Sequence, residues 1–304
     1  MLGTDLKARR RSTALLMFAS LFATPVFGQQ NEPEIVVTAA SRQQVQSFVS
    51  EIAIAPSGAD QYGRWDEAIC VGVAGLPARQ GQFIADRVAQ RAFAVGLAPG
   101  GPGCRPNVTV VVAPDGNAMA QRMFDNDPSL FAHRYESGIS TLGQEALTDF
   151  INTQRPVRWW HVTRTVSADG EILSSENTAS GADGFSTEVV RSSGSRLSST
   201  TRQDFARVVI IVDAESAGRV QLAGLADYIA MVALAQLKPD AQTGSFPSIM
   251  NLFSSEAGGS RTNELSQWDL AFLSGLYAAN REASSTTAQR SDIVRRMTGQ
   301  SSGS

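Results

Sequence analysis

The feature that most constrains the fold is an alternation of strand and helix patterns over residues 68–113. Residues 68–74 have the pattern of a strand, and apolar residues recur at helical spacing through residues 78–97. The Pro- and Gly-rich run 99–103 ends this helix, and the β-branched run 107–113 predicts a buried strand. A strand, a helix and a strand in this order predict a βαβ unit, whose strands normally lie parallel with a right-handed crossover. We therefore expect an α/β or α+β protein.

Strand and helix patterns continue in the C-terminal half of the chain. Residues 158–166 alternate as a strand does, and residues 208–212 form the most strongly apolar strand pattern in the sequence. An apolar stripe at helical spacing begins at Leu222, and Pro239 ends that helix. A further helix is expected near residues 267–279.

The first 28 residues have the pattern of a secretory signal peptide. Basic residues at positions 7–11 precede an apolar run at 14–27, and the small residues Val26 and Gly28 suit a cleavage site before Gln29. The apolar run is shorter than the ~20 residues that span a bilayer, so we expect no transmembrane segment in the mature chain. An uncleaved N-terminal anchor is the alternative. We expect export to the periplasm, with secretion from the cell as a second destination.

The expected domain organisation follows from changes in composition along the chain. After the signal peptide, residues 29–60 are polar and are expected to form a flexible leader. Within them, residues 34–39 are strand-like and could add to the edge of a partner's sheet. One globular domain is expected over residues 61–282, followed by a charged helix and a polar tail over residues 283–304.

Charge and composition exclude several classes of function. Residues 1–28 carry a net charge of +3, so their removal changes the formal net charge of the chain from −3 to −6. A moderately acidic chain without a basic tract has few cations to replace phosphate counterions, so we expect no nucleic-acid partner. The chain contains only 2 His and 2 Cys, too few for a Cys₄ site, a His₃ site or an iron–sulfur cluster. We therefore expect no cofactor and no metal.

Export gives the two cysteines a simple interpretation. In an oxidising compartment Cys70 and Cys104 are expected to form one disulfide, which would tie the first strand to the start of the second. Closing a loop of about 35 residues stabilises a fold by roughly 3–4 kcal/mol on the chain-entropy model. A catalytic thiol is the alternative, and it would need an unpaired cysteine beside a histidine.

The order of elements after residue 205 resembles the catalytic half of zinc metallopeptidases of the zincin class, especially the metzincins. Residues 205–213 resemble the strand that leads to the active-site helix, and residues 222–237 resemble that helix. Ser248-Ile249-Met250 resembles a Met-turn, and Asp269 lies in a segment that resembles the helix after it. The resemblance implies a single zincin-like domain with a mixed central sheet flanked by helices.

The positions that would bind zinc carry aliphatic residues instead. In the family motif His-Glu-x-x-His, the two histidines fall on Ile229 and Ala233, and the general base falls on Ala230. None of these side chains can bind zinc or activate water, so no catalytic residue carries over. We therefore expect a pseudoenzyme: an exported, non-catalytic envelope protein that acts in binding or assembly, with an envelope protein or a small ligand as its partner.

The residues leave a second function open. Asp213 and Asp227 lie near the carboxyl end of the apolar strand and could form the carboxylate pair of a metal-independent hydrolase acting on envelope glycans or peptides. Acids at strand ends also cap helices, which is the competing interpretation. Trp159, Trp160 and His161 could line a cleft near these acids, or they could pack into the core.

Overall fold

The computed structural model describes residues 40–132, 138–171, 198–254 and 262–299, which all belong to one compact unit. The expected signal peptide and the strand-like patch at residues 34–39 lie outside these described residues.

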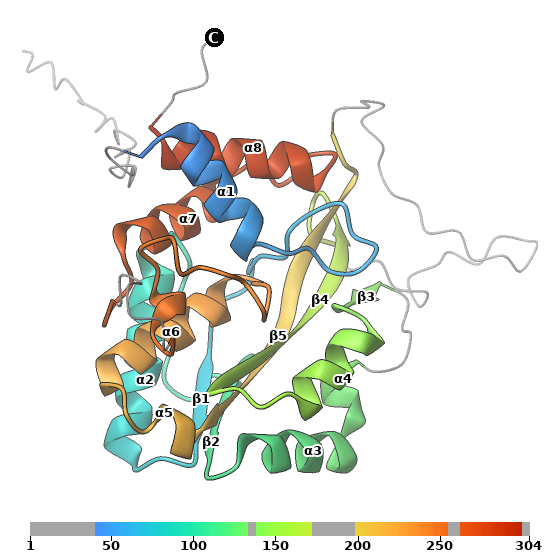
Figure 1. The fold of residues 1–304 in the computed structure, drawn as a ribbon. Coiled ribbons are helices and arrows are strands. Elements are labelled where there is room, and N and C mark those ends of the chain that lie inside the picture. The colour runs from blue at the N-terminus through green and yellow to red at the C-terminus, as the bar shows by residue number, and fades with distance from the viewer. Residues whose placement is uncertain (1–39, 133–137, 172–197, 255–261, 300–304) are drawn as a thin grey trace, which may run out of the picture. The chain divides into compact units, whose positions relative to one another are not determined.

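A mixed sheet of five strands organises the described residues (Figure 1). The spatial order is β1-β2-β5-β4-β3. Strands β1, β2 and β5 lie parallel, whereas β4 pairs antiparallel with both β5 and β3. The strands are β1 (Val71–Ala74), β2 (Val108–Ala113), β3 (Ile139–Ser140), β4 (Val157–Ser167) and β5 (Thr201–Asp213). The expectation of a mixed central sheet is confirmed.

The predicted βαβ unit is confirmed, with α2 (Ala78–Phe93) crossing between the parallel strands β1 and β2. Gly75 begins the crossover with a φ of +85°, and a Cβ atom there would lie 1.9 Å from the carbonyl oxygen of Val112. Only glycine fits such a turn. The expected disulfide is also present, because Cys70 and Cys104 are bonded with a Cα–Cα distance of 6.0 Å.

Helices flank both faces of the sheet and create two apolar clusters (Figure 1). On one face α2 packs against α6, and α7, α8 and α1 form a further layer. On the other face α3, η1 and α4 pack against β4 and β5. Besides α2, the helices of the larger cluster are α1 (Arg42–Ile52), α6 (Leu222–Leu234), α7 (Gln267–Ala278) and α8 (Thr286–Met297). Those of the smaller cluster are α3 (Gly116–Asn126), the 3₁₀ turn η1 (Pro128–Phe131) and α4 (Gln144–Asn152).

Helix α1 corrects the expectation of a flexible leader that extends to residue 60. Ser41 and Gln44 form a capping box at its start, and its apolar face is fully buried. The ring of Phe48 lies edge-on to those of Phe246 and Trp268, with centroids 5.4 Å and 5.3 Å apart. Residues 42–52 therefore belong to the core of the domain.

The C-terminal boundary is also corrected. Residues 283–304 were expected to form a charged helix and a polar tail after the domain; α8 is a helix in this segment, and its Ile293, Val294 and Met297 are buried against α7 and α1. In the part of the chain that the structure describes, no helix combines the length and the apolarity needed to cross a membrane.

Candidate functional site

Helix α6, which carries the positions that match zinc ligands in the resembled family, is buried along nearly its whole length. Every residue from Gly224 to Leu234 is buried, and the exposed fraction of Ile229, Ala230 and Ala233 is 0%. A helix that is apolar on all sides is typical of a protein interior. Aliphatic side chains in this setting offer no donor atom to a metal ion, so the residues present do not fit a catalytic zinc.

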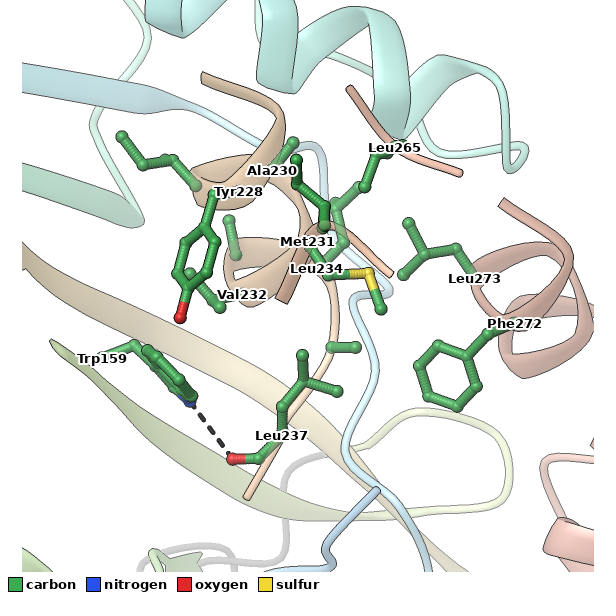
Figure 2. Packing of buried hydrophobic residues seen from close by; sticks show 14 of the residues in the cluster. Trp159, Tyr228, Ala230, Met231, Val232, Leu234, Leu237, Leu265, Phe272 and Leu273 are labelled. Carbon is green, nitrogen blue, oxygen red and sulfur yellow. Dashed lines mark hydrogen bonds between the residues drawn. The ribbon is translucent and has the colours of Figure 1, made fainter. Parts of the chain in front are cut away.

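Side chains from distant parts of the sequence bond the carbonyl groups at the C-terminal end of α6. Trp65 Nε1 donates to the carbonyl oxygen of Ala233 at 2.8 Å, and Tyr277 Oη donates to that of Leu234 at 2.7 Å. Trp159 Nε1 donates to the carbonyl oxygen of Leu237 at 3.2 Å, as Figure 2 shows. Leu237 lies three residues beyond the helix. The last carbonyls of a helix have no partner within the helix, and Trp65 and Tyr277 supply one for Ala233 and Leu234.

Asp227 ties α6 to α2. Its two oxygens accept hydrogen bonds from Arg91 Nε at 2.9 Å and Arg91 Nη2 at 2.8 Å, and the backbone N–H of Leu265 donates to Oδ2 at 3.1 Å. Arg87 Nη1 lies 3.8 Å from Oδ1. Asp227 has an exposed fraction of 0%, and its hydrogen bonds raise the pKa of Arg91. The carboxylate is therefore fully engaged within the fold.

Asp213 acts as a helix cap, as one of the two interpretations of this acid predicts. Its Oδ1 accepts from the backbone N–H of Ser216 at 2.8 Å, at the start of α5 (Ala214–Ala217). Its Oδ2 accepts from the N–H of Gly116 at 2.8 Å, at the start of α3. Burial raises the pKa of Asp213, but these backbone hydrogen bonds outweigh it, so the pKa lies below its ordinary value. Both oxygens are used in local structure.

The Met-turn-like run is bonded to the start of α7. Ser248 Oγ donates to Asp269 Oδ1 at 2.6 Å, and the N–H of Ile249 donates to Asp269 Oδ2 at 2.8 Å. Burial raises the pKa of Asp269 in spite of these hydrogen bonds. The run forms the 3₁₀ turn η3 (Ile249–Asn251), which packs against α6, and Met250 contacts the larger apolar cluster.

Of the two interpretations of Trp159, Trp160 and His161, the structure agrees with the second, because all three residues pack in the core. Their exposed fractions are 5%, 2% and 2%. Side chains alternate along β4, so Trp159 faces α6, whereas Trp160 joins the smaller cluster and donates to the carbonyl oxygen of Phe131 at 3.0 Å. The space that the two Trp residues border is about 10 Å³, enough for a single water.

His161 also lies among apolar groups. Its ring centroid is 4.7 Å from that of Phe205, and burial lowers the pKa of His161 to about 3. A histidine with so low a pKa is neutral at physiological pH. Across the described residues, no group of three or more His, Cys, Asp or Glu side chains is placed to hold a metal ion.

Larger hollows lie away from α6. Two of about 570 Å³ and 550 Å³ flank the disulfide loop, and a third of about 200 Å³ lies among β3, β4 and β5. The third is bordered by Gln203, a buried amide that the sequence analysis did not single out. The sequence gives little indication that Gln203 is buried, because a polar residue inside a strand is expected to face water.

Comparisons of this chain with protein-family models, with curated proteins and with solved structures give no match.

Proposed function

We propose that this chain is an exported, non-catalytic envelope protein that uses a degenerate, zincin-like scaffold for binding or assembly. The observation that carries the proposal is that α6 is buried and has aliphatic side chains at the positions that correspond to zinc ligands. The positions where the resembled family needs two histidines and a glutamate are occupied by Ile229, Ala233 and Ala230, and all three have an exposed fraction of 0%. A catalytic zinc needs donor atoms and an open coordination position, and neither is available at these positions.

The contacts around α6 support the scaffold part of the proposal. Strand β5, α6, η3 and α7 follow one another in the order that the resemblance implies. The Ser248–Asp269 and Ile249–Asp269 hydrogen bonds hold the Met-turn-like run against the next helix. A scaffold can retain such contacts after its chemistry is lost, because they stabilise the fold independently of a metal.

The hydrolase alternative gains no support from the acids that suggested it. Asp213 and Asp227 both use their two oxygens in hydrogen bonds within the fold. A general acid or nucleophile has to reach a substrate, and these carboxylates point to backbone and arginine donors instead.

Elemental analysis of the purified chain tests the loss of zinc chemistry. We expect far less than one zinc ion per chain, and no effect of a chelator on the melting temperature. Stoichiometric zinc with chelator-sensitive peptidase activity would contradict the proposal. So would metal-independent hydrolysis of envelope glycans that is lost in Asp213→Asn while the fold is intact.

Export is tested separately. Residues 1–40 fused to an alkaline phosphatase that requires its disulfides should give enzyme activity, and the processed chain should begin at Gln29. A matched fusion in which Lys7, Arg9, Arg10 and Arg11 are replaced by Glu should lose both. Equal activity of the two fusions would contradict the assignment of a signal peptide.

A further inference from the structure

The outer edge of the sheet at β1 has backbone groups that are not paired. Strand β1 ends the strand order, so among the described residues only its side that faces β2 is paired with another strand. The N–H groups of Asn107 and Val108 both donate to the carbonyl oxygen of Cys70 at 3.0 Å. Successive residues of a strand bond to opposite sides, so Val71 and Val73 direct their N–H and C=O groups to the outer side.

The chain itself shows that this edge accepts a further extended segment. Just before β1, the N–H of Ile69 donates to the carbonyl oxygen of Ala98 at 3.0 Å, and the N–H of Gly100 donates to the carbonyl oxygen of Ile69 at 2.7 Å. The two segments lie parallel there. The chain then turns away through residues 101–104, and the next outward residue, Val71, has no backbone partner on this side within the described structure.

The hollow of about 570 Å³ beside the disulfide loop lies along this open edge, and we call it the edge groove. Val71 is one of its lining residues and is half-buried, so solvent reaches this part of the edge. Figure 1 shows α2 alongside β1, and α2 forms one wall of the groove. Residues 100–104 form the opposite wall. A groove beside an open strand edge is the setting in which proteins bind an extended peptide as an added strand.

The wall on α2 selects the side chains of such a peptide. Asp86 is the one charged residue among the described residues that line the groove, and it is exposed. Its Oδ1 accepts from Gln82 Nε2 at 2.7 Å, but no ion pair within the described residues neutralises it. A basic side chain of the ligand can therefore pair with Asp86.

An apolar contact lies further along the same face of α2. Phe93 follows Ala89, a lining residue of the groove, by four residues, so its side chain lies one helical turn beyond it. Phe93 has an exposed fraction of 69%, the highest among the large hydrophobic residues of the described structure. An apolar side chain of the ligand would cover part of this ring.

The surroundings favour a single extended chain over a second copy of this protein. Strand β1 has only four residues, and the edge before it is already occupied by Ala98 and Gly100. Two copies that paired through β1 would use the same surface on each side of a two-fold axis. Each would then present its Asp86 wall to that of the other, and like charges repel.

We propose that the edge groove binds an extended peptide segment of a partner protein, which adds as a strand beside Val71 and directs a basic side chain to Asp86 and an apolar one to Phe93. This gives a site to the binding role proposed above. It does not depend on the zincin-like resemblance, because no lining residue of the groove lies on α6, η3 or α7. Zinc analysis can therefore succeed or fail independently of this proposal.

Titration of the full mature chain with the peptide acetyl-Thr-Lys-Thr-Val-Thr-Phe-Thr-amide tests the site. Alternation places Lys, Val and Phe on one face of the extended peptide. We expect a dissociation constant of the order of 100 μM by calorimetry, and shifts of the amide NMR signals of residues 71, 73 and 86. The same peptide with Glu in place of Lys should bind at least about threefold more weakly.

Two methylated peptides test whether the ligand adds as a strand. One is N-methylated at Lys, Val and Phe, and the other at the last three Thr residues. An added strand donates hydrogen bonds to the edge from alternate residues only, so one of these peptides loses its donors and the other keeps them. We expect their dissociation constants to differ at least about tenfold.

Two variants assign the binding to the groove. Asp86→Lys should weaken binding of the Lys peptide at least about threefold and strengthen that of the Glu peptide. Its matched control is Asp125→Lys on α3, because Asp125 is also exposed and also accepts from a glutamine four residues earlier, Gln121, at 2.9 Å. Ala89→Trp fills the groove from α2 and should weaken binding of the Lys peptide at least about tenfold. If one variant does not fold, the other decides.

Four results would overturn the proposal. The first is the absence of heat and of amide shifts with the Lys peptide at about 2 mM. The second is equal binding of the two methylated peptides. The third is binding by Asp86→Lys that matches binding by Asp125→Lys. The fourth is a dimer, detected by sedimentation of the original chain and absent in Ala89→Trp, which would make a second copy the occupant of the groove.

Discussion

Helix α6 packs on strand β5, and the two elements differ in how most of their buried polar groups are paired. At α6, Asp227 is paired with Arg91, and the terminal carbonyls of the helix are bonded to Trp65 and Tyr277. In β5, Gln203 is buried, yet its Oε1 has no partner among the described residues, and the same holds for both amide atoms of Gln236, two residues beyond α6. A paired buried group contributes to stability, whereas a buried group left unpaired costs about 1–3 kcal/mol.

Of the substitutions that test this contrast, Asp227→Ala is expected to change the free energy of unfolding most. Removing the carboxylate leaves Arg91 without its bidentate partner beside a buried helix, and breaking a buried ion pair costs about 3–5 kcal/mol. We expect a loss of this size in the free energy of unfolding, measured by chemical denaturation. Asp149→Ala removes the partner of Arg155 at a half-exposed site and should cost less than about 1 kcal/mol. Equal losses in the two variants would contradict the structural role of Asp227.

Removal of the disulfide, which lies outside both α6 and the surroundings of Gln203, is expected to cause the second large loss of stability. Replacing Cys70 and Cys104 with Ser removes the closure of a loop with a sequence separation of 34. We expect a loss of about 3–4 kcal/mol in the free energy of unfolding. A reductant should destabilise the original chain by a similar amount and leave the double variant unchanged. If the reductant affects both equally, the effect does not come from this bond.

Tyr277→Phe and Gln203→Leu compare the two regions directly with smaller effects. Tyr277→Phe removes only the hydroxyl that bonds to the carbonyl of Leu234, and an unpaired buried group costs about 1–3 kcal/mol. Gln203→Leu removes an amide that is already half unpaired, so we expect a change of less than about 1 kcal/mol. Denaturation of both variants under the same conditions checks the difference. A larger loss in Gln203→Leu would reverse the contrast.

The smallest expected effect is a dependence on pH through Asp213. Its pKa is lowered in the folded chain, so its stabilising contribution is present above the unfolded value of about 3.9 and is lost as the pH falls through the folded value. Asp213→Asn should therefore be less stable than the original chain at neutral pH, and the difference should shrink in acid. A difference that is constant with pH would show that ionisation of Asp213 is not involved.

Local sequence patterns were sufficient to predict the βαβ unit, the strand β5 and the helices α6 and α7. These elements have strong apolar periodicity, which is the most reliable signal of secondary structure. Helix α1 was missed because its surroundings are polar and rich in glutamine. The signal was nevertheless present, since Val45, Phe48, Val49 and Ile52 have helical spacing and Ser41 begins a capping box.

The site was less predictable than the fold, because its contacts are long-range. Nothing near Asp227 in the sequence indicates that Arg91, at a separation of 136 residues, is its partner. Trp159 and Trp160 look equivalent in the sequence, but successive side chains of β4 point to opposite faces of the sheet, so the two residues lie in different apolar clusters. Only the pairing of strands and helices in space distinguishes a buried, satisfied group from one such as Gln203.

The aromatic caps of α6 also have a consequence for the kinetics of folding. Trp65 and Tyr277 lie 168 and 43 residues from the α6 carbonyls that they bond, and Trp159 lies 78 residues from Leu237, just beyond the helix. Closing loops of this length costs entropy before the contacts repay it, which slows folding. We therefore expect α6 to acquire its final hydrogen bonds late, after strand β4 and helix α7 have docked. Until then the apolar surface of α6 is exposed, and partly folded chains can associate through it.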